Sequence, residues 1–238
     1  MKVSTALVTG SAVGIGRALV LALAEDGLDV AVHYRDSREE AERVVGEAEG
    51  FGVRAIALQA DVTDPEKARG LVDAAAAQLG RLDVLINNVG NYHRGPLDTL
   101  DDKTWHAMFA SNLHATFYTC QQAVPIMRAL GGGRIINIGY AGAEYLKARP
   151  TIAPYQIAKT GVILYSKALA RTEAETSITV NVISPGVMEN SVTKPLDTVP
   201  SGRLGRLSEL VAAARYLLSD EAAYITGVTI EVAGGWNL

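Results

Sequence analysis

The sequence has little of several features that characterise whole classes of protein. Its 238 residues include a single cysteine, Cys120, so the chain cannot form an internal disulfide framework or a cysteine-rich zinc site. Positive charge is not in excess either, because 22 Lys and Arg stand against 26 Asp and Glu, a formal net charge of −4. This balance argues against nucleic acid and anionic lipid as partners.

Long hydrophobic runs are also missing. The apolar start at Val3–Val8 breaks at Gly10, so it is too short to span a bilayer, and it lacks the apolar core and cleavage pattern of a signal peptide. A lone cysteine fits a reducing compartment. We therefore expect a cytoplasmic protein that has no membrane partner.

The sequence does contain a regular alternation of two kinds of segment. Hydrophobic residues make up 48% of the chain and charged residues 20%, which provides enough apolar side chains for a substantial core. Short runs rich in Val and Ile predict strands at Val3–Thr9, Asp29–Tyr34, Val53–Leu58, Val84–Asn87, Arg134–Ile138, Thr179–Ile183 and Val228–Val232. Longer segments with helical spacing predict helices at Ile15–Asp26, Ser37–Ala48, Pro65–Leu79, Asp102–Leu130, Pro154–Thr172 and Ser208–Leu218.

This alternation predicts an α/β fold. Near-continuous apolar strands flanked by amphipathic helices imply a doubly wound parallel sheet of about seven strands, with helices on both faces. No linker, repeat or low-complexity stretch divides the chain, so we expect a single domain over residues 1–238. The least regular stretch, Met188–Arg206, is expected to form a surface loop.

A glycine-rich turn follows the first predicted strand and leads directly into a helix. Its residues are Gly10, Ser11, Ala12, Val13, Gly14, Ile15 and Gly16. Glycines in this setting permit a sharp turn and a close approach of the backbone to a diphosphate, whose charge the helix N-terminus stabilises. The spacing G-x-x-x-G-x-G differs from the commoner G-x-G-x-x-G, and simple tight-turn packing would need the same glycines. The strand-turn-helix setting favours a dinucleotide site.

Tyr155 and Lys159 stand four residues apart on a predicted helix, so both side chains lie on one face. Reducing a ketone by hydride transfer requires a proton for the developing alkoxide. A free phenol, with a pKa of about 10, must be acidified to supply that proton near neutral pH. A nearby ammonium group and an oxidised nicotinamide both stabilise phenolate. The same spacing also occurs in pairs of solvent-exposed side chains on a helix. Only the position of the pair in the fold can distinguish a catalytic pair from an exposed one.

Further motifs follow in a fixed order along the chain. They are Asp61-Val62 after the third predicted strand, Asn87-Asn88-Val89-Gly90 after the fourth, Asn112 in the long helix, and Pro185-Gly186 after the sixth. With the glycine turn and the Tyr155–Lys159 pair, they resemble the short-chain dehydrogenase/reductase family over essentially the whole chain. The C-terminal motifs Tyr224–Gly227 and Val232–Gly235 look like those of 3-oxoacyl-acyl-carrier-protein reductases in particular.

The resemblance implies a Rossmann-fold oxidoreductase that transfers hydride between NADP(H) and a small-molecule carbonyl or secondary alcohol. A 3-oxoacyl thioester reductase is the most similar known activity. The implied cofactor-binding residues are Gly10, Ser11, Gly14, Ile15, Gly16, Tyr34, Arg35, Asp61, Val62, Asn88, Val89, Gly90, Tyr155, Lys159, Pro185 and Gly186. The implied catalytic residues are Tyr155, Lys159, Asn112 and Tyr140.

The family pattern implies a role for each of the central residues. Tyr155 would be the proton donor, and Lys159 would both tune it and reach the nicotinamide ribose. Asp61 and the Val62 amide would lie against the adenine. Asn112 would hold a water in a proton relay to the lysine, although an asparagine there can also bend back to its own helix turn.

Tyr140 is the one departure from the pattern, because it stands where the family has a serine that hydrogen-bonds the substrate carbonyl. Its phenol can donate and accept like a serine, but from several ångströms further out. Three interpretations stay open: Tyr140 replaces the serine, Tyr145 or Thr151 donates instead, or activity is weak. Weak activity would suit a cofactor-binding regulatory or assembly protein. Pteridine reductases, a branch of the family, also lack this serine, so reduction of another carbonyl or a pteridine is a further alternative.

The nicotinamide preference depends on the end of the second predicted strand. The family's NAD-selecting acid aligns with uncharged Tyr34, and the donors that follow could bind a 2′-phosphate; they are Arg35, Ser37 and Arg38. Asp36 lies near the spacing at which an acid selects NAD, and Val13 replaces a basic residue that many NADP-preferring members have. The balance favours NADP(H), with NAD(H) not excluded.

Two further expectations concern assembly and the remaining polar or aromatic residues. Family members pair their two long helices across a two-fold axis, and Trp105, Phe109 and Phe117 exceed what one sheet face needs, so we expect a homodimer or homotetramer. Trp236 could line a subunit contact or the pocket of a neighbouring subunit. The histidines have no metal-ligand spacing and are expected to be packing or surface residues; they are His33, His93, His106 and His114.

Overall fold

Seven parallel strands form one sheet in the computed structural model, which describes residues 3–237. The strand order is β3-β2-β1-β4-β5-β6-β7. The strands are β1 (Thr5–Val8), β2 (Asp29–Tyr34), β3 (Ala55–Gln59), β4 (Val84–Asn87), β5 (Gly133–Ile138), β6 (Ile178–Pro185) and β7 (Thr229–Val232). All seven predicted strands are confirmed, with ends shifted by two residues at most. The single domain predicted over residues 1–238 stays a prediction, since residues 1–2 and 238 lie outside the described range.

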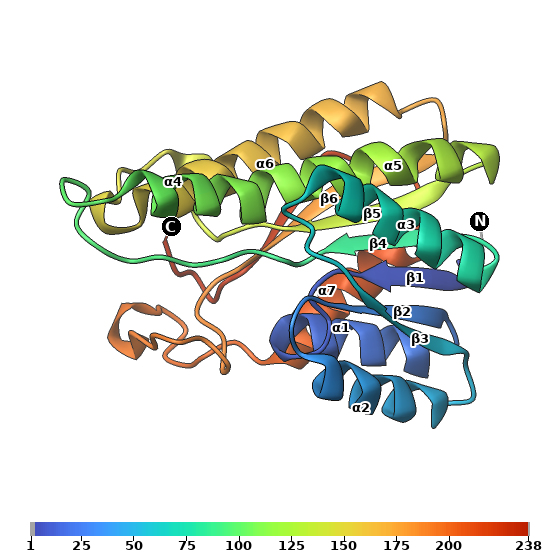
Figure 1. The fold of residues 1–238 in the computed structure, drawn as a ribbon. Helices are drawn as coiled ribbons and strands as arrows, with labels where there is room; N and C mark the ends of the chain where they lie inside the picture. Colours follow the sequence, from blue (N-terminus) through green and yellow to red (C-terminus); the bar gives the residue numbers. More distant parts are fainter. Residues whose placement is uncertain (1–2, 238) are drawn as a thin grey trace.

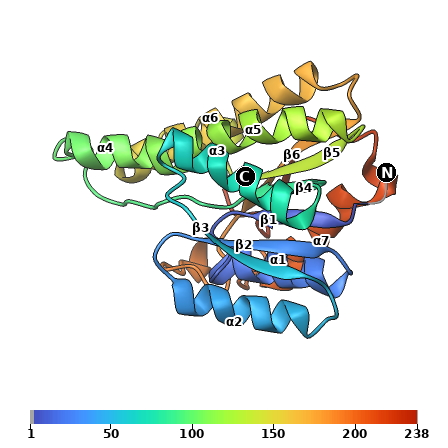
Figure 2. The same ribbon diagram turned by 45° about the vertical axis from the view of Figure 1, so that its right-hand side comes forward.

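Helices cover both faces of the sheet, as Figures 1 and 2 show. One face carries α1 (Gly14–Glu25), α2 (Arg38–Glu49) and α7 (Leu207–Leu218), and the other carries α3 (Pro65–Leu79), α5 (Ala115–Ala129) and α6 (Ala153–Thr172). Ile86 of β4 belongs to the first core and its neighbour Leu85 to the second, because successive side chains of a strand point to opposite faces. Each such fully buried side chain stabilises the fold by roughly 1.5–3 kcal/mol. The predicted doubly wound α/β fold is confirmed.

The long helix predicted at Asp102–Leu130 is interrupted, and this is a correction to the sequence prediction. It begins as α4 (Asp102–Phe109), where the Asp101 side chain accepts a hydrogen bond from the Thr104 amide at 2.6 Å. It widens into a π-helical turn at Ala110–His114 and continues as α5. Single π turns inside α-helices frequently occur at functional sites, and this one carries Asn112.

A buried polar network attaches the upper helices of Figure 1 to the centre of the sheet. Asn87, at the end of β4, donates to Asn137 Oδ1 on β5 at 2.9 Å and accepts a hydrogen bond from Thr119 of α5 at 2.7 Å. Asn137 in turn donates to Ser166 Oγ on α6 at 2.8 Å. The network therefore fixes α5 and α6 against β4 and β5, and with them the helices that carry Asn112, Tyr155 and Lys159.

The carboxyl ends of all seven strands meet at one edge of the sheet, where the longest loops gather. One loop joins β5 to α6 and contains two 3₁₀ turns, Ala143–Tyr145 and Pro150–Ile152. The other is the predicted irregular stretch Met188–Arg206, which contains a short 3₁₀ turn at Leu196–Thr198 and an isolated bridge between Met188 and Gly205. None of the helices in the described part of the chain is both long and apolar enough to cross a membrane.

Candidate active site

The glycine turn between β1 and α1 is shaped by close backbone packing. Gly10 and Gly14 have φ angles of 63° and 59°, in the left-handed region that favours glycine. A side chain on Gly16 would overlap the Gly10 carbonyl oxygen, which is backbone and cannot swing away. Val13, which precedes α1, has an apolar side chain and caps none of the first amides, and the first turn carries no acidic residue. These amides are therefore free to bind an anion such as a diphosphate.

Two side chains hold this turn in place. Asn88, after β4, donates to the carbonyl oxygens of Thr9 and Gly10, both at 3.1 Å. His33 of β2 accepts a hydrogen bond from the Gly10 amide at Nδ1, at 2.8 Å, and its Nε2 lies 3.0 Å from the Ala60 carbonyl oxygen. Because Nδ1 is the acceptor, Nε2 carries the proton. Burial lowers the pKa of His33 to about 4, so the imidazole is neutral at physiological pH.

His33 is a buried packing residue, as the sequence interpretation expected, and only its contact with the glycine turn was not predicted. The signal that could have identified it is a polar side chain inside a buried strand, facing a glycine turn. Ser11 is the converse case. Its hydroxyl donates to the Val8 carbonyl at 2.7 Å and accepts from the His33 amide at 3.0 Å, so this predicted cofactor residue points into the protein.

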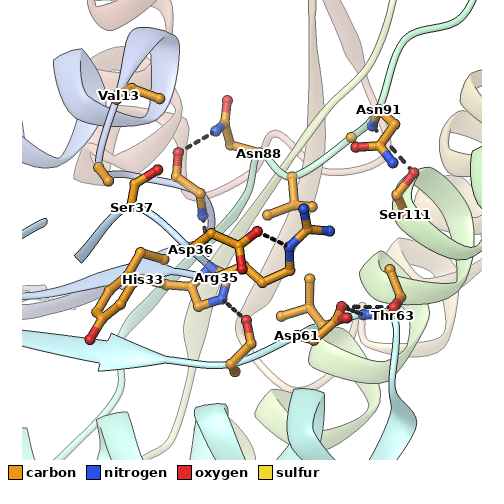
Figure 3. A pocket seen from close by; sticks show the side chains of 17 residues that line it. Val13, His33, Arg35, Asp36, Ser37, Asp61, Thr63, Asn88, Asn91 and Ser111 are labelled. Atoms are coloured by element: carbon orange, nitrogen blue, oxygen red, sulfur yellow. Dashed lines mark hydrogen bonds and ion pairs between the residues drawn. The ribbon is translucent and has the colours of Figure 1, made fainter. Parts of the chain in front are cut away.

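Beside the turn lies a cavity of about 380 Å³ at the carboxyl ends of β1 to β4 (Figure 3). Eight of the predicted cofactor residues line it: Gly10, Tyr34, Arg35, Asp61, Val62, Asn88, Val89 and Gly90. Asp36 and Ser37, which the sequence analysis weighed for the nicotinamide preference, also line it. The lining further includes residues that were not predicted as cofactor contacts, namely Ala12, Val13, His33, Ala60, Thr63, Asn91 and Ser111. The lining extends from Arg35 and Asp36, which follow β2, to Ser111 in the π-helical turn. A dinucleotide site lies in this way along the carboxyl ends of parallel strands.

The remaining predicted cofactor residues lie outside the lining of this cavity. Gly14, Ile15 and Gly16 form the start of α1, and the Ile15 side chain packs against the core. Pro185 ends β6, and the Gly186 amide donates to the Val232 carbonyl at 3.0 Å. These two residues therefore join the end of β6 to the end of β7.

Opposite charges lie side by side at the end of the cavity formed by the segment after β2. Arg35 donates to Asp36 at 2.6 Å, and both side chains are exposed (Figure 3). The Asp61 carboxylate accepts hydrogen bonds from the side chain and backbone of Thr63, and these bonds lower its pKa. This end of the cavity therefore offers a guanidinium for a phosphate and carboxylates for ribose hydroxyls.

Tyr155 and Lys159 lie on one face of α6, as their spacing predicts. The Lys159 ammonium is buried and donates to the Ile138 carbonyl at 2.7 Å, and it lies 5.9 Å from the centre of the Tyr155 ring. Burial lowers the pKa of Lys159 from 10.5 to about 8. Burial also raises the pKa of the Tyr155 phenol, with a smaller contribution from Tyr140 and Tyr92. The pair therefore combines a phenol that loses its proton less readily than a free tyrosine with an ammonium group close to its ring.

Asn112 lies in the π turn beside this pair. Its Nδ2 donates to the Met108 carbonyl of its own helix at 3.0 Å and to the Asn91 carbonyl at 2.9 Å. Its Oδ1 is buried and has no hydrogen-bond partner among the described residues. A side chain on Gly90 would overlap this oxygen, and its Cβ would lie 3.3 Å from the Lys159 ammonium. The amide therefore bends back to its helix and still leaves an acceptor near Lys159.

Tyr140, which the sequence analysis aligned with the family's serine, is buried just after β5 against Tyr155. The two rings meet edge to face, with centroids 5.3 Å apart. Burial raises the pKa of Tyr140. The two alternative donors, Tyr145 and Thr151, are exposed residues of the β5–α6 loop. Trp236 also packs against Tyr140, with centroids 5.8 Å apart, so the structure places it at this site within its own chain.

The sequence predicts no metal-binding role for the histidines. Within residues 3–237, no group of three or more His, Cys, Asp or Glu side chains is placed to hold a metal ion.

Comparisons with known proteins agree with this geometry. A family model described as enoyl-(acyl carrier protein) reductase matches residues 10–237. The 3-oxoacyl-[acyl-carrier-protein] reductase FabG of Staphylococcus aureus is 38% identical over 241 residues, which cover 97% of this chain and 97% of the relative.

Two solved structures have a similar fold over nearly the whole chain. The acetoin dehydrogenase YohF of Salmonella typhimurium has a TM-score of 0.90 at 30% identity, covering 99% of this chain and 96% of the other. A blue fluorescent protein from a metagenomic library, solved in complex with NADPH, has a TM-score of 0.93 at 33% identity, covering 99% and 98%. The resemblance seen in the motifs is confirmed, and the chain belongs to the short-chain dehydrogenase/reductase family of oxidoreductases.

Proposed function

We propose that this enzyme is an NADP(H)-dependent reductase of carbonyl compounds, with 3-oxoacyl thioesters as its substrate class. The observation that carries the proposal is the position of Lys159. Its ammonium lies beside Gly90, and Gly90 lines the cavity that the glycine turn borders. A cofactor in that cavity would therefore end next to Lys159 and Tyr155, where a hydride and a proton are needed together. The FabG relative supports the substrate class.

The residues present fit a dinucleotide along the whole cavity. The uncapped amides of α1 suit the diphosphate, Asp61 and Val62 suit the adenine, and the missing side chain at Gly90 leaves room beside Lys159. A bound nicotinamide cofactor supplies or accepts the hydride. The protein's own contribution is to orient it and to move the proton.

In the reduction, Tyr155 donates its proton to the substrate oxygen as negative charge develops there. The raised pKa of its phenol means that positive charge must be close before the proton leaves. Lys159 provides that charge from a buried position, held by the Ile138 carbonyl. Asn112 Oδ1 is placed to accept a hydrogen bond from a water that returns a proton to Lys159.

We assign the missing serine's role to Tyr140. Its ring touches Tyr155, whereas Tyr145 and Thr151 are exposed. A second function, cofactor binding with little turnover, follows from the same residue if its hydroxyl cannot reach the substrate. The experiments on Tyr140 below distinguish the two.

The preference for NADP(H) rests on Arg35 and Ser37, which line the far end of the cavity, and on uncharged Tyr34. The structural relative that binds NADPH supports it. Asp36 competes, because it holds the Arg35 guanidinium in an ion pair. A 2′-phosphate must therefore share or replace Asp36 as the partner of Arg35.

We also propose a cytoplasmic homodimer or homotetramer, paired through its long helices. Phe117 of α5 and Leu164 of α6 are 37% and 69% exposed, and Ile157 is 49% exposed. Trp105 and Phe109 of α4 pack on each other and stay partly exposed. These apolar side chains lie on helices that cover one face of the sheet, and a partner would bury them.

Replacing Tyr140 with Phe should lower the turnover of acetoacetyl-CoA by about 10²–10³, because a donor aimed at a developing oxyanion is typically worth 3–4 kcal/mol. The dissociation constant of NADPH should not change. Tyr145→Phe is the matched control and should be silent, while Tyr155→Phe marks complete loss of the proton donor. A change below about threefold for Tyr140→Phe would remove its hydroxyl from the reaction. A wild type inactive with acetoacetyl-CoA, diacetyl, quinones and pteridines would favour the cofactor-binding protein.

Replacing Arg35 with Ala should weaken NADPH binding by about 1.5–3 kcal/mol and leave NADH binding almost unchanged, because the lost hydrogen bonds are to a charged phosphate. Isothermal titration with both cofactors measures this. Asp36→Asn is the matched variant, and it should keep or tighten NADPH binding because it releases the guanidinium. Equal losses for both cofactors, or tighter wild-type binding of NADH, would reverse the assignment.

Replacing Lys159 with Met should abolish turnover and stabilise the cofactor-free protein by about 1–3 kcal/mol at pH 7, since a buried ammonium with a depressed pKa favours unfolding. The folded-state pKa of about 8 lies below the ordinary 10.5, so the cost is complete below pH 8 and fades as the pH rises towards 10.5. Urea unfolding of both proteins at pH 7 and pH 10 measures it. A Met variant less stable than wild type at pH 7 would show that Lys159 stabilises the fold.

Light scattering at micromolar concentration should show a dimer or tetramer. Leu164→Glu should shift the protein to smaller species, because it places a charge in an apolar contact. Phe51→Glu changes another exposed apolar residue, on the loop between α2 and β3, and should leave the mass unchanged. A monomeric wild type would contradict the proposed assembly.

A further inference from the structure

The C-terminal segment Gly234–Asn237 runs between the two long loops at the carboxyl edge of the sheet. On one side, the Gly234 carbonyl accepts from the Ser201 amide at 3.0 Å, and the Trp236 indole N–H donates to Thr198 Oγ1 at 3.0 Å. On the other side, Asn237 donates to the Ala141 carbonyl at 3.0 Å. The segment therefore joins the loop after β6 to the loop after β5.

The Trp236 ring is the centre of this junction. It meets the Tyr140 ring edge to face, with an interplanar angle of 88°, and Tyr140 meets Tyr155 in the same way at 75°. The Arg149 guanidinium lies 5.6 Å above the indole and also donates to the Asn237 side chain. A continuous line of aromatic contacts thus leads from the C-terminal segment to the catalytic phenol.

A tyrosine at this position needs such support more than a serine would. Its hydroxyl lies at the end of a long rigid side chain, so a small rotation at its base moves the donor by a large distance. A displacement of about 1 Å in a catalytic group can cost roughly a hundredfold in rate. Trp236 and Tyr155 both contact the Tyr140 ring edge to face, so each contact restricts how that ring can turn.

We propose that Trp236 is a positioning residue for the reaction: it holds the Tyr140 ring against Tyr155, and its bond to Thr198 links that hold to the loop after β6. The inference rests on the proposed role of the Tyr140 hydroxyl. It gives the C-terminal segment a part in turnover although no atom of it needs to touch the substrate or the cofactor.

Steady-state kinetics with NADPH and acetoacetyl-CoA test the inference through Trp236→Leu, which removes the aromatic contact. We expect kcat to fall about ten- to a hundredfold, with the NADPH dissociation constant unchanged. Trp236→Phe keeps a ring beside Tyr140 but loses the N–H, so it should lose little more than Thr198→Val, and the two changes combined should not add. Phe51→Leu is the control for loss of an exposed aromatic side chain at the opposite edge of the sheet.

The double variant with Tyr140→Phe identifies the route of the effect. If Trp236 acts by positioning the hydroxyl, then Trp236→Leu should cost nothing further once Tyr140 is Phe. Additive losses, or a normal kcat for Trp236→Leu, would overturn the inference while a slow Tyr140→Phe left the proposed function intact. A silent Tyr140→Phe would instead refute the role of Tyr140, and the inference with it.

Hydrogen exchange provides a readout that needs no substrate. In Trp236→Leu, amides of residues 141–149 and 196–202 should both exchange faster than in wild type, while those of β1 and β4 keep their rates. The same variant in the presence of saturating NADPH should still show the difference, because Trp236 lies outside the lining of the cofactor cavity. Unchanged exchange in either loop would show that the segment does not link them, and would overturn the inference.

Discussion

The active site depends on a hydrogen-bonded network of side chains buried between the sheet and two helices. Asn87 and Asn137 end or nearly end the two central strands, and their amides bond to each other and to Thr119 and Ser166. Burying such groups without partners would cost several kcal/mol, so the network admits few alternative placements of the helices. The network therefore fixes the position of the helices that carry Asn112, Tyr155 and Lys159 relative to the carboxyl ends of β4 and β5.

The site depends on glycines, which have no side chain, as much as on the residues whose side chains line it. Gly10 and Gly16 let two backbone segments touch, and Gly90 leaves space beside Asn112 and Lys159. The buried ammonium of Lys159 donates to the Ile138 carbonyl, and its lowered pKa reflects the cost of keeping the charge out of water. Such a cost is common at catalytic groups, whose function requires a perturbed pKa.

Much of this arrangement could be predicted from the sequence, because the signals are local. The strands are apolar on both faces, and the glycine turn and the Tyr155–Lys159 spacing each lie within one strand-turn-helix or one helix. What could not be predicted comes from contacts between distant segments. The π turn at Ala110–His114 has no local signal, and His33 matters only because Gly10 folds against it.

Tyr140 and Trp236 show the same limit most clearly. The motifs identify Tyr140 as a departure from the family pattern, but they leave open whether it points at the catalytic tyrosine. Its ring contacts Tyr155 within the same part of the chain, whereas its contact with Trp236 joins residues almost 100 positions apart. The departure is visible in the sequence, but the residue that packs against it is visible only in the folded protein.

The most direct test of this account is a crystal structure of the enzyme with NADPH. The account predicts the adenosine end against Asp61 and Val62, the diphosphate at the start of α1, and the nicotinamide end beside Tyr155 and Lys159. It also predicts that Tyr140 keeps its place between Tyr155 and Trp236. A cofactor bound away from this cavity, or a nicotinamide directed away from Tyr155, would contradict it.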